Sequence, residues 1–238
     1  MDIVVALGLI LSVILGSGIV FALRPKTSTV KFLLSFSGAY LLSVCVMEMI
    51  PEVYGALAMR SGVFILVGFL IQLILSYFSD GMEHGHMHTG QHSLSMAVLV
   101  SLFVHSFVEG MALGGDVPHT HFGQSLLAGI FLHKIPVAVV ITTVLSQGTM
   151  KMSRVYLILA IFALTSPAGA WFATHAETLW MQEGFLVPVV LAVVSGMLLH
   201  ISTIILFETS HDHRFNAYKL ITILVGVSLA FAAHFLGA

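Results

Sequence analysis

Two apolar stretches hold the polar residues that decide how this chain folds: LVSLFVHSFVEGMALGG, residues 99–115, and LAGIFLHKIPVAVVITTVL, residues 127–145. Each belongs to an apolar run of roughly the 20 residues that a helix needs to cross a bilayer. Each nevertheless carries ionisable side chains, His105 and Glu109 in the first run and His133 and Lys134 in the second. Ionisable groups at bilayer depth are costly and by default indicate a function.

The composition of the whole chain agrees with a membrane environment. Of its 238 residues, 58% are hydrophobic and 8% are charged, whereas a soluble domain usually has about 25% charged residues. A net charge of -2 argues against a nucleic-acid partner, which usually meets a basic surface. The single cysteine, Cys45, excludes an internal disulfide and a cysteine-based zinc site.

Apolar runs separated by short polar, Pro- or Gly-containing breaks predict an all-α, polytopic membrane protein with eight transmembrane helices. The chain is expected to form a single transmembrane domain over 1–238, with a His-containing cytoplasmic loop at about 80–92. The expected spans cover about 3–23, 30–50, 62–79, 93–114, 123–145, 154–174, 185–207 and 217–236.

The basic residues predict the orientation of these spans. Arg60 stands alone on one side, and Lys134 lies inside a helix. The other basic residues flank the first, fifth and seventh connections: Arg24, Lys26, Lys31, Lys151, Arg154, Arg214 and Lys219. Because basic residues concentrate on the cytoplasmic side, both termini are expected to be extracytoplasmic. The chain is then a multi-pass protein of the cell membrane, and a prokaryotic inner or plasma membrane is expected.

The ionisable residues of the two quoted runs suit a metal ion. His105 and Glu109 are four residues apart and therefore share one face of a helix. With His133 from the next span they offer two imidazoles and one carboxylate, a ligand set that favours zinc among divalent metals. Pro136 frees a backbone carbonyl at the same depth, which is tolerated where a helix lines a cavity. The alternative is a buried His–Glu hydrogen bond that only joins helices.

The motifs HSFVEG, residues 105–110, and HKIP, residues 133–136, resemble the paired signatures of the ZIP (ZRT/IRT-like) metal transporters. Those signatures read roughly HNxx(D/E)G on the fourth helix and H(E/D)xP(H/E) on the fifth. The resemblance implies passage of zinc, iron or manganese toward the cytoplasm, with His105, Glu109 and His133 as metal ligands. It also implies an elevator-like movement of helices 1, 4, 5 and 6 against 2, 3, 7 and 8, commonly in a homodimer.

The chain departs from the family pattern at the position of a second metal ion. Lys134 stands where two-metal members have a carboxylate, and Val137 stands where they have His or Glu. Ser106 replaces the asparagine of the fourth helix, and Ser166 replaces an acid that often precedes the proline of the sixth. We expect the charge of Lys134 to substitute for the missing second cation. The competing interpretation is that Lys134 pairs with Glu109 and closes the site to metal.

Further histidines and acids are candidates for a metal pathway that passes Ser106. The expected entrance at the outer end comprises Glu48, Glu52, Asp116, His119 and His121, and the expected exit comprises His200 and Glu208. The expected weak metal contacts in cytoplasmic loops are His84, His86, His88, His92, His211 and His213. Ordinary surface chemistry and a solvated linker are the alternatives. His175 and His234, at outer helix ends, are expected to be interfacial rather than ligands.

The favoured function is therefore transport of a divalent transition metal, with Zn²⁺ as the substrate, and no enzymatic activity. No GxxxxGK[ST] motif is present, so a gradient or an external partner must drive transport. One alternative is a non-transporting relative that acts as a metal sensor or structural membrane protein. The least favoured alternative is an intramembrane zinc-dependent hydrolase. The sequence leaves open the choice among transition metals, coupling to protons and a second copy as partner.

Overall fold

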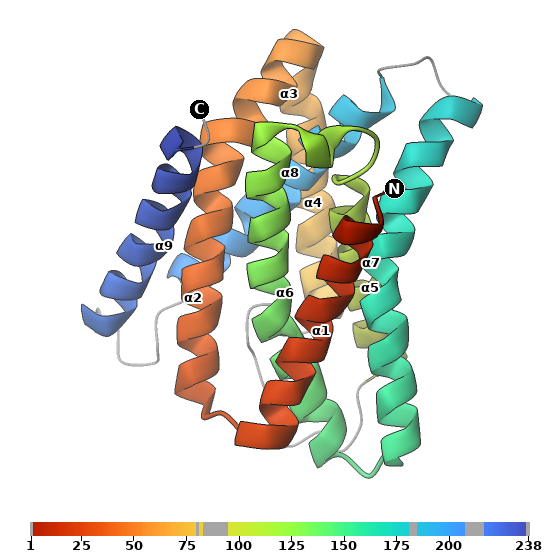
Figure 1. Cartoon of the computed structure of the whole chain (residues 1–238), viewed down its shortest axis with the longest axis vertical. Coiled ribbons are helices and arrows are strands. Elements are labelled where there is room, and N and C mark those ends of the chain that lie inside the picture. Colours follow the sequence, from red (N-terminus) through yellow and green to blue (C-terminus); the bar gives the residue numbers. More distant parts are fainter. Residues whose placement is uncertain (1, 80, 83–94, 181–184, 208–216, 237–238) are drawn as a thin grey trace.

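The computed structural model describes residues 2–79, 81–82, 95–180, 185–207 and 217–236 (Figure 1). All long regular elements in these ranges are helices, which confirms the all-α prediction. The α-helices are α1 (Ile3–Leu23), α2 (Thr27–Val44), α3 (Ile50–Leu57), α4 (Ser61–Phe78), α5 (Met96–Met111), α6 (His121–Gln147), α7 (Met152–Trp180), α8 (Leu186–Phe207) and α9 (Ala217–Leu236). Shorter elements are a π-helical turn (Cys45–Met49) and the 3₁₀ turns Ala58–Arg60 and Val117–His119.

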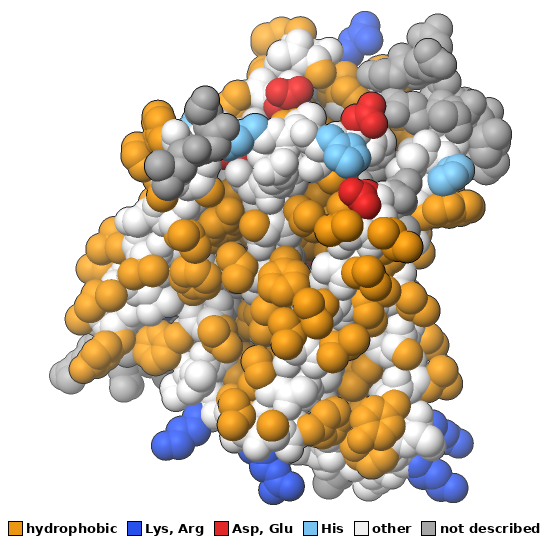
Figure 2. All heavy atoms as spheres, in the orientation of Figure 1, with side chains coloured by type: hydrophobic (Ala, Val, Ile, Leu, Met, Phe, Trp, Pro, Cys, Tyr) orange, Lys and Arg blue, Asp and Glu red, His pale blue; other side chains and the backbone are white. Residues whose placement is uncertain are grey.

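The outside of the helix bundle is apolar. Within the described residues, six helical segments are long and apolar enough to cross a membrane, and Met96–Met111 is a shorter apolar helix. Large hydrophobic side chains such as Leu7, Leu66 and Ile221 are exposed on this surface. Figure 2 shows hydrophobic side chains over the middle of the molecule and charged ones at its two ends. An exposed apolar surface of this extent is typical of contact with lipid.

The region predicted as the span 30–50 is longer than expected. One of the six segments is a helical run of 52 residues, Thr27–Phe78, because the chain stays helical through Pro51. Pro51 has no N–H to donate, and the turn before it widens so that the Ile50 N–H reaches the Cys45 carbonyl. The run still contains two rods, because the backbone turns at Ala58, where φ is 49°, and the Ser61 hydroxyl donates back to the Val53 carbonyl.

Other boundaries differ from the prediction by a few residues. The expected span 93–114 is the shorter helix Met96–Met111, whereas 154–174 extends to Met152–Trp180. Pro136 and Pro167 lie inside α6 and α7, which remain helical through both prolines. Pro136 therefore removes one backbone donor without ending α6, in agreement with the single span predicted over 123–145.

Glycines allow two helix pairs to approach closely. A Cβ atom on Gly110 of α5 would collide with the backbone of Ser166 in α7, and one on Gly169 would collide with Phe107. Cβ atoms on Gly68 of α4 and Gly196 of α8 would likewise collide with the backbone of the facing helix. Small residues at such crossings are typical of helix packing in membranes. The α5–α7 contact fixes the backbone beside His105 and Glu109.

The buried core consists of two apolar clusters with a polar layer between them. Ile130 of α6 belongs to one cluster and Val137 to the other, and His133 and Lys134 fall between them. The same order occurs on α5 and α7, where the residues between the clusters are His105, Ser106, Glu109 and Ser166. The fold therefore gathers the polar residues of the two motifs into one layer and covers it with apolar packing on both sides.

Candidate metal centre

Three potential metal ligands meet in the polar layer. His105 and Glu109 extend from α5 and His133 from α6, and one ligand atom of each lies within 4.8 Å of the other two. The side chains are buried, with exposed fractions of 3%, 2% and 1% in that order. The rings of His105 and His133 are edge to face, with centroids 6.3 Å apart. The two predicted motifs thus converge on one point.

The hydrogen bonds of His105 leave a lone pair aimed at Glu109. Its Nδ1 lies 3.0 Å from Oε1 of Gln72, an acceptor, so Nδ1 carries the hydrogen. In a neutral imidazole, Nε2 is then an acceptor, and it faces Oε1 of Glu109 at 3.2 Å. Two acceptors at this separation need a proton or a cation between them. A histidine whose second ring nitrogen is hydrogen-bonded in this way is suited to bind a metal ion.

Lys134 occupies the other side of Glu109. Its Nζ is 3.4 Å from Oε2 of Glu109 and donates to Oγ of Ser106 at 2.9 Å. The ammonium also lies 5.1 Å from the centre of the Phe162 ring. Ser106 is held by Ser166, whose hydroxyl donates to the Ser106 carbonyl at 2.6 Å. The two carboxylate oxygens of Glu109 therefore face different partners, a histidine and an ammonium.

Gln72 is a residue that the sequence reasoning missed. It is fully buried on α4, and its side chain reaches the first histidine of the fourth-span motif. The available signal was a lone amide in the apolar run GFLIQLILSYF, residues 68–78. Hydrogen bonds to the second nitrogen of a histidine ligand orient the ring and raise its basicity.

Replacement of Gln72 by leucine should weaken zinc binding by about 10–100-fold, as expected when such an outer partner of a ligand is lost. Isothermal titration of the purified protein with zinc measures the change. Gln72→Glu is the matched variant, because it keeps an acceptor for the His105 N–H. Equal affinity in all three proteins would mean that Gln72 does not position a ligand.

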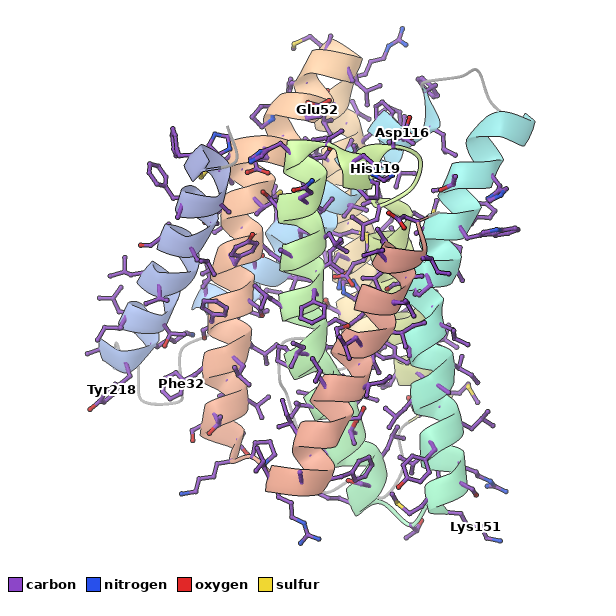
Figure 3. The ribbon with its side chains drawn as sticks, in the orientation of Figure 1. Phe32, Glu52, Asp116, His119, Lys151 and Tyr218 are labelled. Atoms are coloured by element: carbon purple, nitrogen blue, oxygen red, sulfur yellow. The ribbon has the colours of Figure 1, made fainter. Side chains whose placement is uncertain are left out.

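The predicted entrance residues divide into two groups. Glu52, Asp116 and His119 are exposed at one end of the bundle (Figure 3), which we call the acidic end. Glu48, in the π-helical turn, and His121, in the first turn of α6, form the second group, which lies close to His234.

The predicted exit and loop contacts are only partly described. His200 is buried with its ring edge to face against Phe69, at a centroid distance of 4.8 Å. The remaining candidates, Glu208, His84, His86, His88, His92, His211 and His213, lie outside the described residues.

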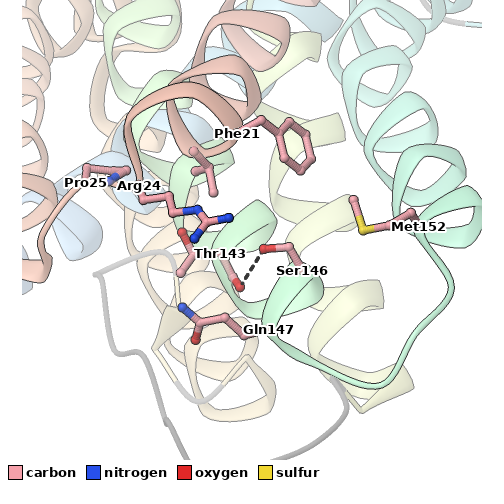
Figure 4. Close-up of a pocket in the computed structure, with 8 residues that line it drawn as sticks. Phe21, Arg24, Pro25, Thr143, Ser146, Gln147 and Met152 are labelled. Carbon is pink, nitrogen blue, oxygen red and sulfur yellow. Dashed lines mark hydrogen bonds between the residues drawn. The ribbon is translucent and has the colours of Figure 1, made fainter.

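The opposite end of the bundle is basic. Lys151 lies there (Figure 3), and Figure 2 shows further blue side chains beside it. A pocket at this end lies between Arg24 of the α1 end, Thr143 of α6 and Met152 of α7 (Figure 4). Among the residues that the structure describes, neither a histidine nor an acid lines this pocket. We call this the basic end.

Comparison with known proteins identifies the family. A family model described as the ZIP zinc transporter matches residues 78–233, well over half of the chain and including both motifs. The chain belongs to the ZIP zinc transporter family. The resemblance drawn from HSFVEG and HKIP is thereby confirmed.

Curated relatives of this ZIP chain agree with the assignment. The chain is 24% identical to zinc transporter ZIP1 of Danio rerio, over 88% of the chain and 86% of that protein. It is 26% identical to zinc transporter ZIP1 of Takifugu rubripes, over 65% of the chain and 52% of that protein. It is 27% identical to protein zntD of Dictyostelium discoideum, over 62% of the chain. This match spans only 24% of the Dictyostelium protein.

Two expectations change with these comparisons. The relatives named above are eukaryotic, so the expected prokaryotic membrane has no support, although a multi-pass membrane protein does. Members of the family are transporters, so the comparisons do not support the hydrolase alternative. Divalent metal ions and the bilayer are the partners that the family supports.

Proposed function

We propose that this ZIP chain moves a divalent transition-metal ion, with zinc as the first candidate, across the membrane toward the cytoplasm. The observation that carries the proposal is the convergence of His105, Glu109 and His133 in a buried layer, with two acceptors face to face. Three protein ligands with an open fourth position suit a zinc ion that binds reversibly. The names of the relatives, zinc transporters, support zinc as the substrate.

We further propose eight transmembrane spans with both termini outside. The turn at Ala58 supports two spans within Thr27–Phe78, and α5 then adds a short span to the other helices. The basic end, with Lys26 and Lys151, is assigned to the cytoplasm because basic residues concentrate on that side. The acidic end then faces outward and attracts cations.

Alternating access of the elevator type is our proposal for the transport step. The polar layer is closed by an apolar cluster on each side, so release of an ion requires one cluster to separate. In the proposed division, α1 packs on α6 and α7 and α2 packs on α8 and α9, while a further contact between α2 and α6 joins the two groups. Helix α5 packs on α7 and so belongs to the group of α1, and α4 packs on α8 and so belongs to the group of α2. We leave a homodimer as an open proposal.

The test is zinc-65 uptake into proteoliposomes by the unmodified protein and by His133→Ala. Uptake by the unmodified protein should exceed that of protein-free liposomes, and His133→Ala should lower it at least about tenfold, because a metal ligand is lost. His175→Ala is the matched control, since His175 stacks on Trp171 away from the centre. Unchanged uptake in His133→Ala would contradict the proposed site.

A non-transporting metal sensor is the second candidate, and the position of Lys134 favours it. Its ammonium, 3.4 Å from Glu109, already supplies a cation to one carboxylate oxygen. Zinc binding by the purified protein without uptake into liposomes would identify this function.

A further inference from the structure

A second group of metal-ligand side chains lies at the acidic end. Glu48 comes from the π-helical turn, His121 from the first turn of α6 and His234 from the last turn of α9. One ligand atom of each lies within 4.8 Å of the other two. We propose that these three residues bind one divalent transition-metal ion, of the class of zinc, at a site separate from the core centre.

The environment of Glu48 argues for a cation. Its side chain is buried, with 3% exposed, and Oε1 lies 3.1 Å from Nδ1 of His234. Oε2 is also buried and has no hydrogen-bond partner among the described residues. A buried carboxylate oxygen without a donor is costly, so such groups normally have a partner. A bound metal ion supplies that partner for Glu48.

The spacing of the ligands fits a tetrahedral ion. Metal–ligand bonds of about 2.0–2.2 Å place tetrahedral ligand atoms about 3.4 Å apart. The Glu48–His234 separation is 3.1 Å, and the rings of His121 and His234 have centroids 6.2 Å apart. Small side-chain rotations therefore bring all three atoms onto one ion, and water fills the fourth position. Both histidines are partly exposed, so an ion reaches the site from the acidic end.

The local backbone explains why these residues meet. The π-helical turn Cys45–Met49 shifts the helical register immediately before Pro51, and Glu48 lies within it. Such turns occur frequently at functional sites. Helix α2, which continues into the turn that carries Glu48, packs against both α6 and α9. An ion held by the three residues would tie together the ends of three helices.

This end site is independent of the core centre. His121 and His133 are both on α6 and twelve residues apart, a rise of about 18 Å along the helix. Two ions at this separation do not share ligands, so the protein has room for both at once. The inference goes beyond the proposed transport function and does not require that uptake occurs.

The experiment counts zinc ions bound to the purified full-length protein by equilibrium dialysis with zinc-65. His121→Ala/His234→Ala should bind one ion fewer than the unmodified protein, and His105→Ala/His133→Ala should also bind one fewer. A protein with all four substitutions should bind two fewer. His175→Ala is the matched control and should bind as many ions as the unmodified protein.

A conservative variant distinguishes loss of the metal site from loss of the folded structure. Glu48→Gln keeps the size of the side chain and should also bind one ion fewer, with the same helical circular dichroism as the unmodified protein. Cobalt(II) provides a second measurement, because the end-site variants should lose part of its visible absorption. If Glu48→Gln and the His121/His234 variant retain the full count, the end site is wrong. If the variants lose the expected numbers of bound ions but the unmodified protein shows no zinc uptake into proteoliposomes, only the transport proposal is overturned.

Discussion

Replacement of Glu109 by glutamine should abolish zinc uptake and destabilise the folded protein by about 3–5 kcal/mol, the usual effect of removing one partner of a buried ion pair. Glu109 is the acid shared by the metal centre and Lys134, whose Nζ lies 3.4 Å away. Without the carboxylate, zinc loses its anionic ligand and the buried ammonium loses its counter-charge. Uptake into proteoliposomes and unfolding by denaturant in detergent measure the two effects.

A double variant separates the two roles of Glu109. Glu109→Gln/Lys134→Met removes both charges, and replacement of a buried pair by neutral groups is often neutral or stabilising. We therefore expect it to recover most of the lost stability but none of the uptake. Recovery of uptake in the double variant, or normal uptake in Glu109→Gln, would show that Glu109 is structural rather than a ligand.

The sequence predicted the polar layer because its signals are local. The four-residue spacing of His105 and Glu109 places both on one face of α5, and helix geometry alone requires this. His133 and Lys134 stand out because charged and imidazole side chains are rare at bilayer depth. The order of the elements does not explain the convergence, because α5 and α6 pack on α7 rather than extensively on each other. The meeting of His133 with His105 and Glu109 therefore depends on the packing of the whole bundle.

The contacts that the sequence did not predict join residues far apart in the chain. Gln72 and His105 come from different helices, and so do Glu48 and His234, which the chain separates by 186 residues. His234 lies at a helix end, where a histidine is usually interfacial, and only the packing of α9 on α2 brings it to Glu48. The π-helical turn was also missed, because Pro51 predicts a break where the widened turn lets the helix continue.

The variants Lys134→Ala and Lys134→Glu test our proposal that Lys134 substitutes for a second cation. In Lys134→Ala, the buried Glu109 loses its counter-charge on the Oε2 side, and we expect a destabilisation of about 3–5 kcal/mol in zinc-free protein. Uptake should fall, because the geometry of the site depends on the contact of Lys134 with Ser106 and Glu109. Unfolding with and without zinc, together with zinc-65 uptake, measures both effects.

Lys134→Glu replaces the fixed cation by a ligand. Two carboxylates close together cannot both stay ionised without a cation, so this variant should bind one zinc ion more than the unmodified protein and depend on zinc for stability. Lys134→Met is the matched control, because it removes the charge without adding a ligand and should not gain an ion. The competing interpretation makes Lys134 a plug, and then its removal opens the site. A large increase of uptake in both Lys134→Ala and Lys134→Glu would therefore favour the plug and contradict the substitution of charge.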